Sequence, residues 1–415
     1  MTLWQPEYRI RVDGETVTSV TLEGLTVSSG RTDIYAQPQA GYAQISLLET
    51  DEQGVAFEIN DPISIEVKNS SGTYVYLFGG FLTDISIEVA SSGSTALSQR
   101  INLVAVGAIA RLARSIYSGN ISSAKDGDQI FTVLQDLLVN NWSEVAGSLT
   151  WSGYDPTTTW ANAENVGLGE IDRPGQYHLD SQNGITDTVY SVVSGLATSG
   201  LGYIYEDAQG RIGYSDSVHR SQYLAANGYV YLDANQATGP GLSITKRSGD
   251  VRNFVTLAYT SSGNSTVSAS DAGSIALYGR LATIINTTLK NSTDANAQAA
   301  FYLGIRANPQ YMLKSITFEL QNTEIDDTDR NSLLNVFMGM PVDIDNLPAN
   351  MVNERFQGFV EGWTWTAGYN RLRLTLNVSP LGFSIQASQW EDVVNTKRFN
   401  NISTTLTWNN ATIVA

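Results

Sequence analysis

A five-residue strand motif, Phe-x-Gly-Phe-aliphatic, occurs twice in this chain, at 78–82 and again at 356–360. If Phe81 is set opposite Phe359, the residues that follow alternate in the same way in both copies. The face that we expect to be buried comprises Phe81, Thr83, Ile85, Ile87 and Val89 in one copy and Phe359, Glu361, Trp363, Trp365 and Ala367 in the other. The opposite face turns polar in both.

The flanks of the motif repeat as well. A strand beginning near a proline precedes each copy, at 61–65 and 340–344, and a strand beginning with arginine follows, at 100–103 and 371–374. Three landmarks in one order predict an internal duplication. Packing explains each residue: the prolines suit strand starts, Gly80 and Gly358 permit a bulge or a close approach, and the aromatic residues fill cores. The repeat therefore predicts architecture and implies no chemistry.

Short alternating strands dominate both ends of the chain. The first is a hairpin in which 8–12 and 16–22 flank the turn signal Asp13-Gly14, and further strands follow up to Val106. The middle has helical spacing at 126–145 and 186–197, then a hairpin at 202–214. We predict a mainly β fold with an α+β insertion, in which two related tube-type β-barrel domains are separated by a helical and hairpin region. The expected parts are 1–113 (first barrel), 114–250 (insertion), 251–388 (second barrel, with a helix near 293–307) and 389–415 (C-terminal extension).

The amino-acid composition limits the functions that this chain can have. The 415 residues contain no cysteine, so disulfides and thiolate chemistry are excluded. Forty-one acidic against 24 basic residues give a net charge of −17, which disfavours gripping nucleic acid through its phosphates. No run of apolar residues is long enough to span a bilayer, and no secretory signal opens the sequence, so we expect synthesis in a host cytoplasm without a membrane-spanning segment.

Residues that could carry catalysis are few, and we predict no catalytic, cofactor-binding or metal-binding residue. The sequence lacks phosphate-binding glycine loops, and His178 and His219 show no metal-ligand or triad spacing. The acidic cluster 324–329 lacks the glycine and distal glutamate of a calcium loop, and Asp326 or Asp329 suits a cap for a helix at 330–337. We therefore expect no enzymatic activity.

Aromatic residues in the middle of the chain leave one alternative open. Trp142, Trp151, Tyr154 and Trp160 lie in a predicted loop at 149–182 or beside it, where they suit packing, an interface or sugar stacking. A pair of carboxylates for glycoside hydrolysis need not be close in sequence, and no pair stands out.

Several segments together resemble tail hub and baseplate hub proteins of tailed bacteriophages, also known as minor tail proteins. The segments are SGRTDIY at 29–35, QPQAGY at 37–42, FGGFLTDI at 78–85, VAVGAIARL at 104–112, SIALYGR at 274–280, FQGFVEGWTW at 356–365 and the strand ending near 376–380. The resemblance spans most of the chain and concerns fold rather than chemistry.

The resemblance implies a homotrimer with two tube-like barrels per chain. Three chains would then present six quasi-equivalent units, so one face could match a six-fold tail tube while the other carries a three-fold tip. Implied partners are the tail tube or distal tail protein ring, the tape measure protein and tip spike or fibre proteins. Genomic DNA would pass through the lumen during ejection without specific binding, and the acidic balance suits such a wall. The implied location is the virion tail.

Two alternatives remain at this point. A hexameric distal tail protein would share barrel elements but would not need two copies per chain. A receptor-binding, glycan-binding or glycan-degrading tail protein would use the aromatic residues of the middle loop.

Overall fold

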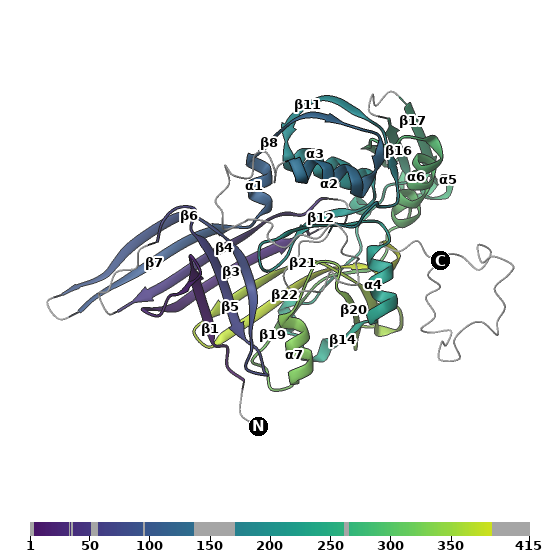
Figure 1. Ribbon diagram of the computed structural model, residues 1–415. Coiled ribbons are helices and arrows are strands. Elements are labelled where there is room, and N and C mark those ends of the chain that lie inside the picture. The colour runs from purple at the N-terminus through teal and green to yellow at the C-terminus, as the bar shows by residue number, and fades with distance from the viewer. Residues whose placement is uncertain are drawn as a thin grey trace.

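The computed structural model describes residues 4–32, 34, 36–50, 57–93, 96–136, 171–260 and 265–383. Strands dominate this part of the chain, as predicted, and 13 of them form one large sheet in which every pairing but one is antiparallel. The 11 strands of its main path run in the order β15-β19-β22-β21-β3-β4-β7-β6-β5-β1-β2, and β20 with β14 branches from β21. Figure 1 shows β6 and β7 extending away from the remainder of the molecule.

The two sequence copies occupy the two halves of this sheet. The first contributes β1 (Tyr8–Val12), β2 (Glu15–Thr16), β3 (Val20–Gly30), β4 (Gln39–Glu49), β5 (Pro62–Lys68), β6 (Tyr74–Gly93) and β7 (Ala96–Val106). The second contributes β14 (Val230–Asp233), β15 (Ser243–Thr245), β19 (Met312–Glu319), β20 (Pro341–Asp345), β21 (Phe356–Gly368) and β22 (Arg371–Pro380), with helix α7 (Asp327–Leu334) packed beside them. The predicted N-terminal turn is present, and Asp13 and Gly14 both have positive φ there. The predicted second strand 16–22 is divided, because β2 ends at Thr16 and residues 20–22 begin β3, which pairs with β4.

Strand register confirms the duplication. Pro62 pairs with Phe81 in the first copy, and Pro341 pairs with Phe359 in the second. The next strand also follows one pattern, because the ladder skips one residue, Thr83 in β6 and Glu361 in β21. Each of these is the extra residue of a β-bulge, two positions after the shared phenylalanine. The same pairing and the same bulge in both copies make an accidental sequence match untenable.

The glycine of the motif has the same structural reason in both copies. A Cβ on Gly80 would meet the carbonyl oxygen of Val106 and would lie 2.7 Å from Cζ of Phe78. A Cβ on Gly358 would meet the carbonyl oxygen of Ser379 and would lie 2.7 Å from Cζ of Phe356. Close packing thus explains these glycines, and the bulge lies three residues further on.

Two details of the predicted repeat are wrong. Since Ile85 pairs with Leu103 and Trp363 with Leu376, the residue equivalent to Arg100 is Arg373, two positions beyond the predicted Arg371. A shift of two keeps the same side chains on the same face, so alternation alone could not detect it.

The predicted buried face also fails in the first copy. Ile87 and Val89 are 53% and 58% exposed, whereas their counterparts Trp365 and Ala367 are buried. The reason is that β21 has a further strand beside it at this point, and β6 does not.

A second core lies beside the large sheet. It includes α1 (Ile109–Arg114), β8 (Ile116–Ile121), β9 (Ala124–Lys125), α2 (Asp126–Asp136), β10 (His178–Leu179), β11 (Gln182–Thr188), α3 (Val189–Ser199), β12 (Tyr203–Glu206) and β13 (Ile212–Ser215). It continues with β16 (Phe254–Tyr259), β17 (Ser265–Ser270), β18 (Ala282–Asn286) and α6 (Ser292–Arg306), near α5 (Ala272–Tyr278). Helix α4 (His219–Asn227) packs near β21 through Leu224 and Phe359.

The predicted domain boundaries stay a proposal. Sheet membership crosses the one at 250, because β14 and β15 lie before it and pair with β20 and β19 after it. The segment 254–303 supplies residues to the second core. The helices expected at 126–145, 186–197 and 293–307 correspond to α2, α3 and α6, and the part of the first beyond Asp136 lies outside the described residues. The C-terminal extension 389–415 also lies outside them.

Candidate assembly interface

The two copies meet edge to edge within one chain. Seven consecutive residues of β21 pair antiparallel with seven of β3, from Gly362 opposite Gly30 to Gly368 opposite Gly24. This junction makes the halves of the large sheet continuous, because β21 otherwise belongs to the second copy and β3 to the first. Trp365 and Val27, which lie opposite each other, are both fully buried.

Glycine permits the tight end of this junction. Gly30 has a φ of +82°, and a Cβ there would lie 2.6 Å from Cα of Gly362. A Cβ on Gly362 would in turn lie 2.6 Å from the carbonyl oxygen of Arg31. Neither Gly30 nor Gly362 has room for a side chain, so the backbones of the two paired strands lie unusually close together at this end.

A buried ion cluster closes the same end. The bulge places the carboxylate of Glu361 beside Arg31, with Nε to Oε2 at 2.7 Å. Arg220 of α4 donates from Nη1 to Oε1 at 2.6 Å and from Nη2 to Oε2 at 2.9 Å, and the Ser379 hydroxyl donates to Oε1. Glu361, Arg220 and Arg31 are 1%, 4% and 8% exposed. The cluster therefore ties both copies and α4 together through one bidentate pair and two further donors, Arg31 and Ser379.

Electrostatics keep this cluster charged. Burial alone would raise the pKa of Glu361, but the two guanidinium groups outweigh it and lower that pKa to about 2. The ring of Tyr203 also interacts with both arginines. Its centroid lies 4.6 Å from Cζ of Arg220 and 5.3 Å from Cζ of Arg31.

Of this cluster, only Glu361 stands out in the sequence. The alternation places Glu361 on the buried face together with Trp363, where a lone carboxylate needs a partner. Its partners come from positions 141 and 330 residues away along the chain, and no local pattern marks them.

The first copy repeats part of this arrangement. Cζ of Arg111 lies 3.7 Å from the ring centroid of Phe81, as Cζ of Arg220 lies 5.2 Å from that of Phe359. The bulge residue, however, is Thr83, whose hydroxyl donates to the carbonyl of Val104. The first copy thus keeps the cation over the phenylalanine and has no carboxylate at the bulge.

Two sheet edges are open at the corresponding positions. Beyond Leu82, β6 pairs with β7 on one side, and no strand in the described ranges pairs with its other side. Strand β15 ends the order of the large sheet and pairs only with β19 there. An unpaired row of backbone N–H and C=O groups is a template for a further strand. Figure 1 shows β6 on the projecting hairpin.

The residues weighed for chemistry have structural contacts. Nδ1 of His219 lies 2.8 Å from Asp172, and Nε2 of His178 lies 3.3 Å from the Ser123 hydroxyl. Asp326 accepts from the N–H of Asp329 and so caps α7, which begins at Asp327 rather than at the expected position 330. Over the described ranges, no three acidic or histidine side chains gather as a metal site would require.

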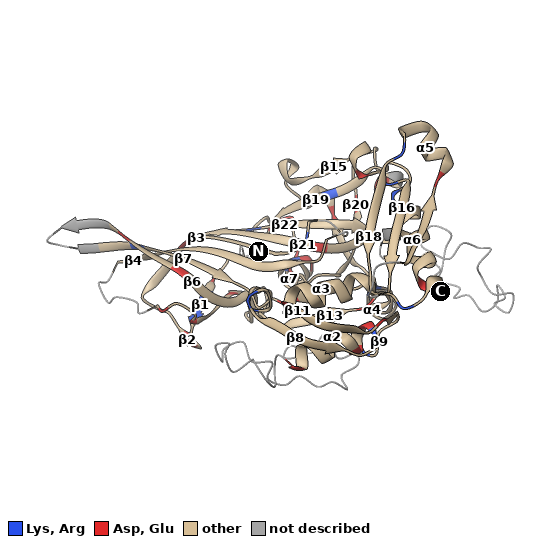
Figure 2. Cartoon of the chain, turned by 90° about the horizontal axis from the view of Figure 1, so that it is seen from above, with Lys and Arg blue, Asp and Glu red and all other residues tan. Residues whose placement is uncertain are grey.

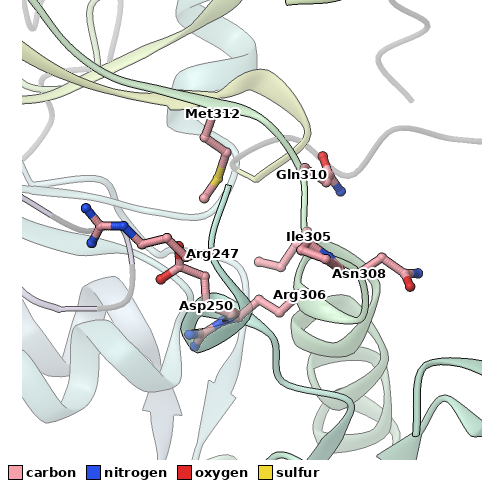
Figure 3. Close-up of a pocket in the computed structure, with 8 residues that line it drawn as sticks. Arg247, Asp250, Ile305, Arg306, Asn308, Gln310 and Met312 are labelled. Atoms are coloured by element: carbon pink, nitrogen blue, oxygen red, sulfur yellow. Dashed lines mark hydrogen bonds between the residues drawn. The ribbon is translucent and has the colours of Figure 1, made fainter. Parts of the chain in front are cut away.

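The remaining candidates add no site. Trp142, Trp151, Tyr154 and Trp160 lie outside the described residues. A shallow pocket at Arg247, Asp250 and Arg306 has room for about one water molecule. Figure 3 shows the Arg247 side chain pointing away from Ile305 on the opposite wall. None of the helices within the described ranges is long and apolar enough to cross a membrane.

Charged residues are dispersed over the fold. Figure 2 shows acidic and basic positions scattered singly along the strands and helices. Over the described residues, the acidic side chains do not gather on one element.

The fold matches solved structures of tail proteins. The tail protein from Neisseria meningitidis MC58 superposes with a TM-score of 0.57 at 10% identity, covering 92% of this chain and 98% of that one. The 43 kDa tail protein of prophage MuSo2 from Shewanella oneidensis gives 0.54 at 10% identity, covering 91% and 99%. No protein-family model matches the sequence, and neither does any curated protein. The chain thus has the fold of these tail proteins over nearly its whole length, and the predicted resemblance is confirmed for the fold.

Proposed function

We propose that this chain is a non-enzymatic structural protein of a phage virion, the hub of the tail tip or baseplate. Three copies form a ring of six quasi-equivalent units. The ring adapts a six-fold tail tube or distal tail protein ring to a three-fold tip, and its lumen forms part of the channel for DNA ejection.

The observation that carries the proposal is the junction between the two copies. Strand β21 already joins β3 within the chain, while the equivalent stretch of β6 and the outer side of β15 are both open. A chain with one occupied junction and two complementary open edges associates head to tail. Association of this kind gives either a closed ring or an open filament, and a tail fold favours the closed ring.

The proposed neighbours follow from this place in the tail. They are the tail tube or distal tail ring on one side and tip spike or fibre proteins on the other, with the tape measure protein and then genomic DNA in the lumen. A net charge of −17 supports a wall along which DNA slides without binding.

Counting chains tests the proposal. Mass photometry of the purified protein over a range of concentrations should detect a species of three times the 45.0 kDa chain mass. Cryo-electron microscopy of intact tails should show three copies around the axis near the tip. Six copies per ring would overturn the trimer and favour a distal tail protein.

Enzymatic activity needs a separate assay. Purified protein should release no product from bacterial cell walls or capsular glycan, and it should bind no sugar on a glycan array. Turnover that increases in proportion to protein concentration would refute the non-enzymatic role.

A further inference from the structure

Strand β15 is the second-copy equivalent of β3. In the first copy, Ile45 of β4 lies opposite Leu103 of β7, and Ser28 of β3 lies opposite Tyr42 of β4. In the second copy, Ile316 of β19 lies opposite Leu376 of β22, and Ile244 of β15 lies opposite Leu313 of β19. Since Leu103 and Leu376 are equivalent, so are Ile45 and Ile316, and their neighbours Gln44 and Ser315 pair with Thr26 and Ser243. The β15–β19 ladder then skips Lys314, so the pair Ile244 and Leu313 takes the place of Val27 and Ala43. The side chains agree, because Leu313, Val27 and Ala43 are buried and Ile244 packs against the same core.

The same correspondence assigns the residues beyond these strands. Thr245 pairs with Met312 as Ser28 pairs with Tyr42, and counting along the chain from there, Arg247 takes the place of Gly30. On the other strand, Thr83 and Asp84 take the places of Glu361 and Gly362.

We propose that β6 of one copy of this chain pairs antiparallel with β15 of the next copy, in the register that β21 and β3 adopt within the chain. Ile87 then lies opposite Ile244, Ser86 opposite Thr245, and Asp84 opposite Arg247. This inference rests on the proposed ring and specifies the strand pairing that closes it.

Charge supports this register. Asp84 on β6 and Arg247 after β15 stand where the internal junction has Gly362 and Gly30, so the close backbone approach of that junction is not repeated between chains. The two side chains carry opposite charges and are exposed, and neither has an ion pair in the part of the chain that the structure describes. A salt bridge between chains would hold the register that buried Glu361 and Arg31 hold within one.

The apolar side chains of β6 agree with it. The exposed Ile87 and Val89 occupy the positions of the buried Trp365 and Ala367. Pairing with another copy would cover the only two large apolar side chains that the described part of β6 leaves exposed.

Disulfide trapping tests the register in a chain that has no cysteine of its own. Arg31 donates its backbone N–H to the carbonyl of Glu361, so these two residues form a hydrogen-bonded pair. Hydrogen-bonded and non-hydrogen-bonded pairs alternate along an antiparallel ladder, so Ser28 and Thr364, three positions further on, form a non-hydrogen-bonded pair. Such pairs bring Cα atoms to about 4.5 Å, within the range that a disulfide bridges. The equivalent pair between chains is Ser86 with Thr245.

The S86C/T245C variant should therefore form covalent dimers and trimers on oxidation. The matched control S28C/T364C should form its disulfide within one chain and stay monomeric on a denaturing gel. The off-register pair S86C/K246C should cross-link poorly. Trimers in mass photometry without S86C/T245C cross-links, or equal cross-linking of the off-register pair, would overturn the register and leave the ring intact. Monomers at every concentration and in the virion would refute the ring itself.

Charge exchange provides a second test that does not depend on oxidation. D84K should weaken assembly about 10- to 100-fold because it places two cations opposite each other. The double variant D84K/R247D should recover most of the loss, while each variant keeps the melting temperature of the unassembled chain. Equal losses in the single and the double variant would contradict the pairing.

Discussion

At the scale of single residues, Glu361 has the largest expected effect. Replacing it with glutamine would leave Arg31 and Arg220 buried without a counter-charge, so E361Q should lower the free energy of unfolding by about 3–5 kcal/mol. Urea denaturation would measure this. The control E88Q alters an exposed glutamate of the other copy and should change stability by less than about 1 kcal/mol. Equal effects of the two variants would mean that the cluster does not hold the junction.

The raised pKa values of two buried carboxyls should make the stability of the fold depend on pH. Burial raises the pKa of Asp126 and of Glu206 to about 7, although Asp126 accepts from Tyr214 and Tyr177 and Glu206 accepts from the N–H of Ile109. The folded chain thus retains protons that the unfolded chain releases. Each group should make the free energy of unfolding fall by up to about 1.4 kcal/mol per pH unit as pH rises from about 4 to about 7.

The variant D126N isolates one of these groups. Asparagine can still accept from Tyr177 and carries no titrating proton, so the fall in the free energy of unfolding between about pH 4 and pH 7 should become shallower by up to about 1.4 kcal/mol per pH unit. Denaturation midpoints across that range would measure it. The same slope in wild type and D126N would contradict the assignment.

At the scale of elements, the glycine of the motif should matter equally in both copies. G80A and G358A each push a Cβ into a carbonyl oxygen and a phenylalanine ring, and each should destabilise the fold by about 1–3 kcal/mol. G195A offers a control, because nothing lies within 4 Å of its Cβ in α3, and it should stabilise by about 0.5–1 kcal/mol. Thermal denaturation compares the three. A cost in only one copy would show that the glycines do not share a role.

Elements also show what the sequence could predict. Alternation and turn residues predicted most strands of the repeat because these signals are local, and the duplication emerged from comparing them. The pairing of β21 with β3 carries no local signal, since its partners are more than 300 residues apart. The membership of β14 and β15 in the large sheet was missed because both are short, with burial that does not alternate cleanly. Likewise, Arg31 and Arg220 look like ordinary surface arginines until the fold brings them to Glu361.

At the scale of the whole molecule, the exposed face of β6 should separate folding from assembly. In the chain by itself, Ile87 and Val89 are more than half exposed, so I87K/V89K should leave its melting temperature unchanged within about 2 °C. In the proposed ring both side chains are covered, so the same variant should reduce trimer formation by at least about tenfold. Mass photometry and a thermal scan on one sample measure the two effects. The counterpart W365K, at a position that is already buried in the chain, should unfold it. Trimers that survive I87K/V89K would place the contact between chains on another edge.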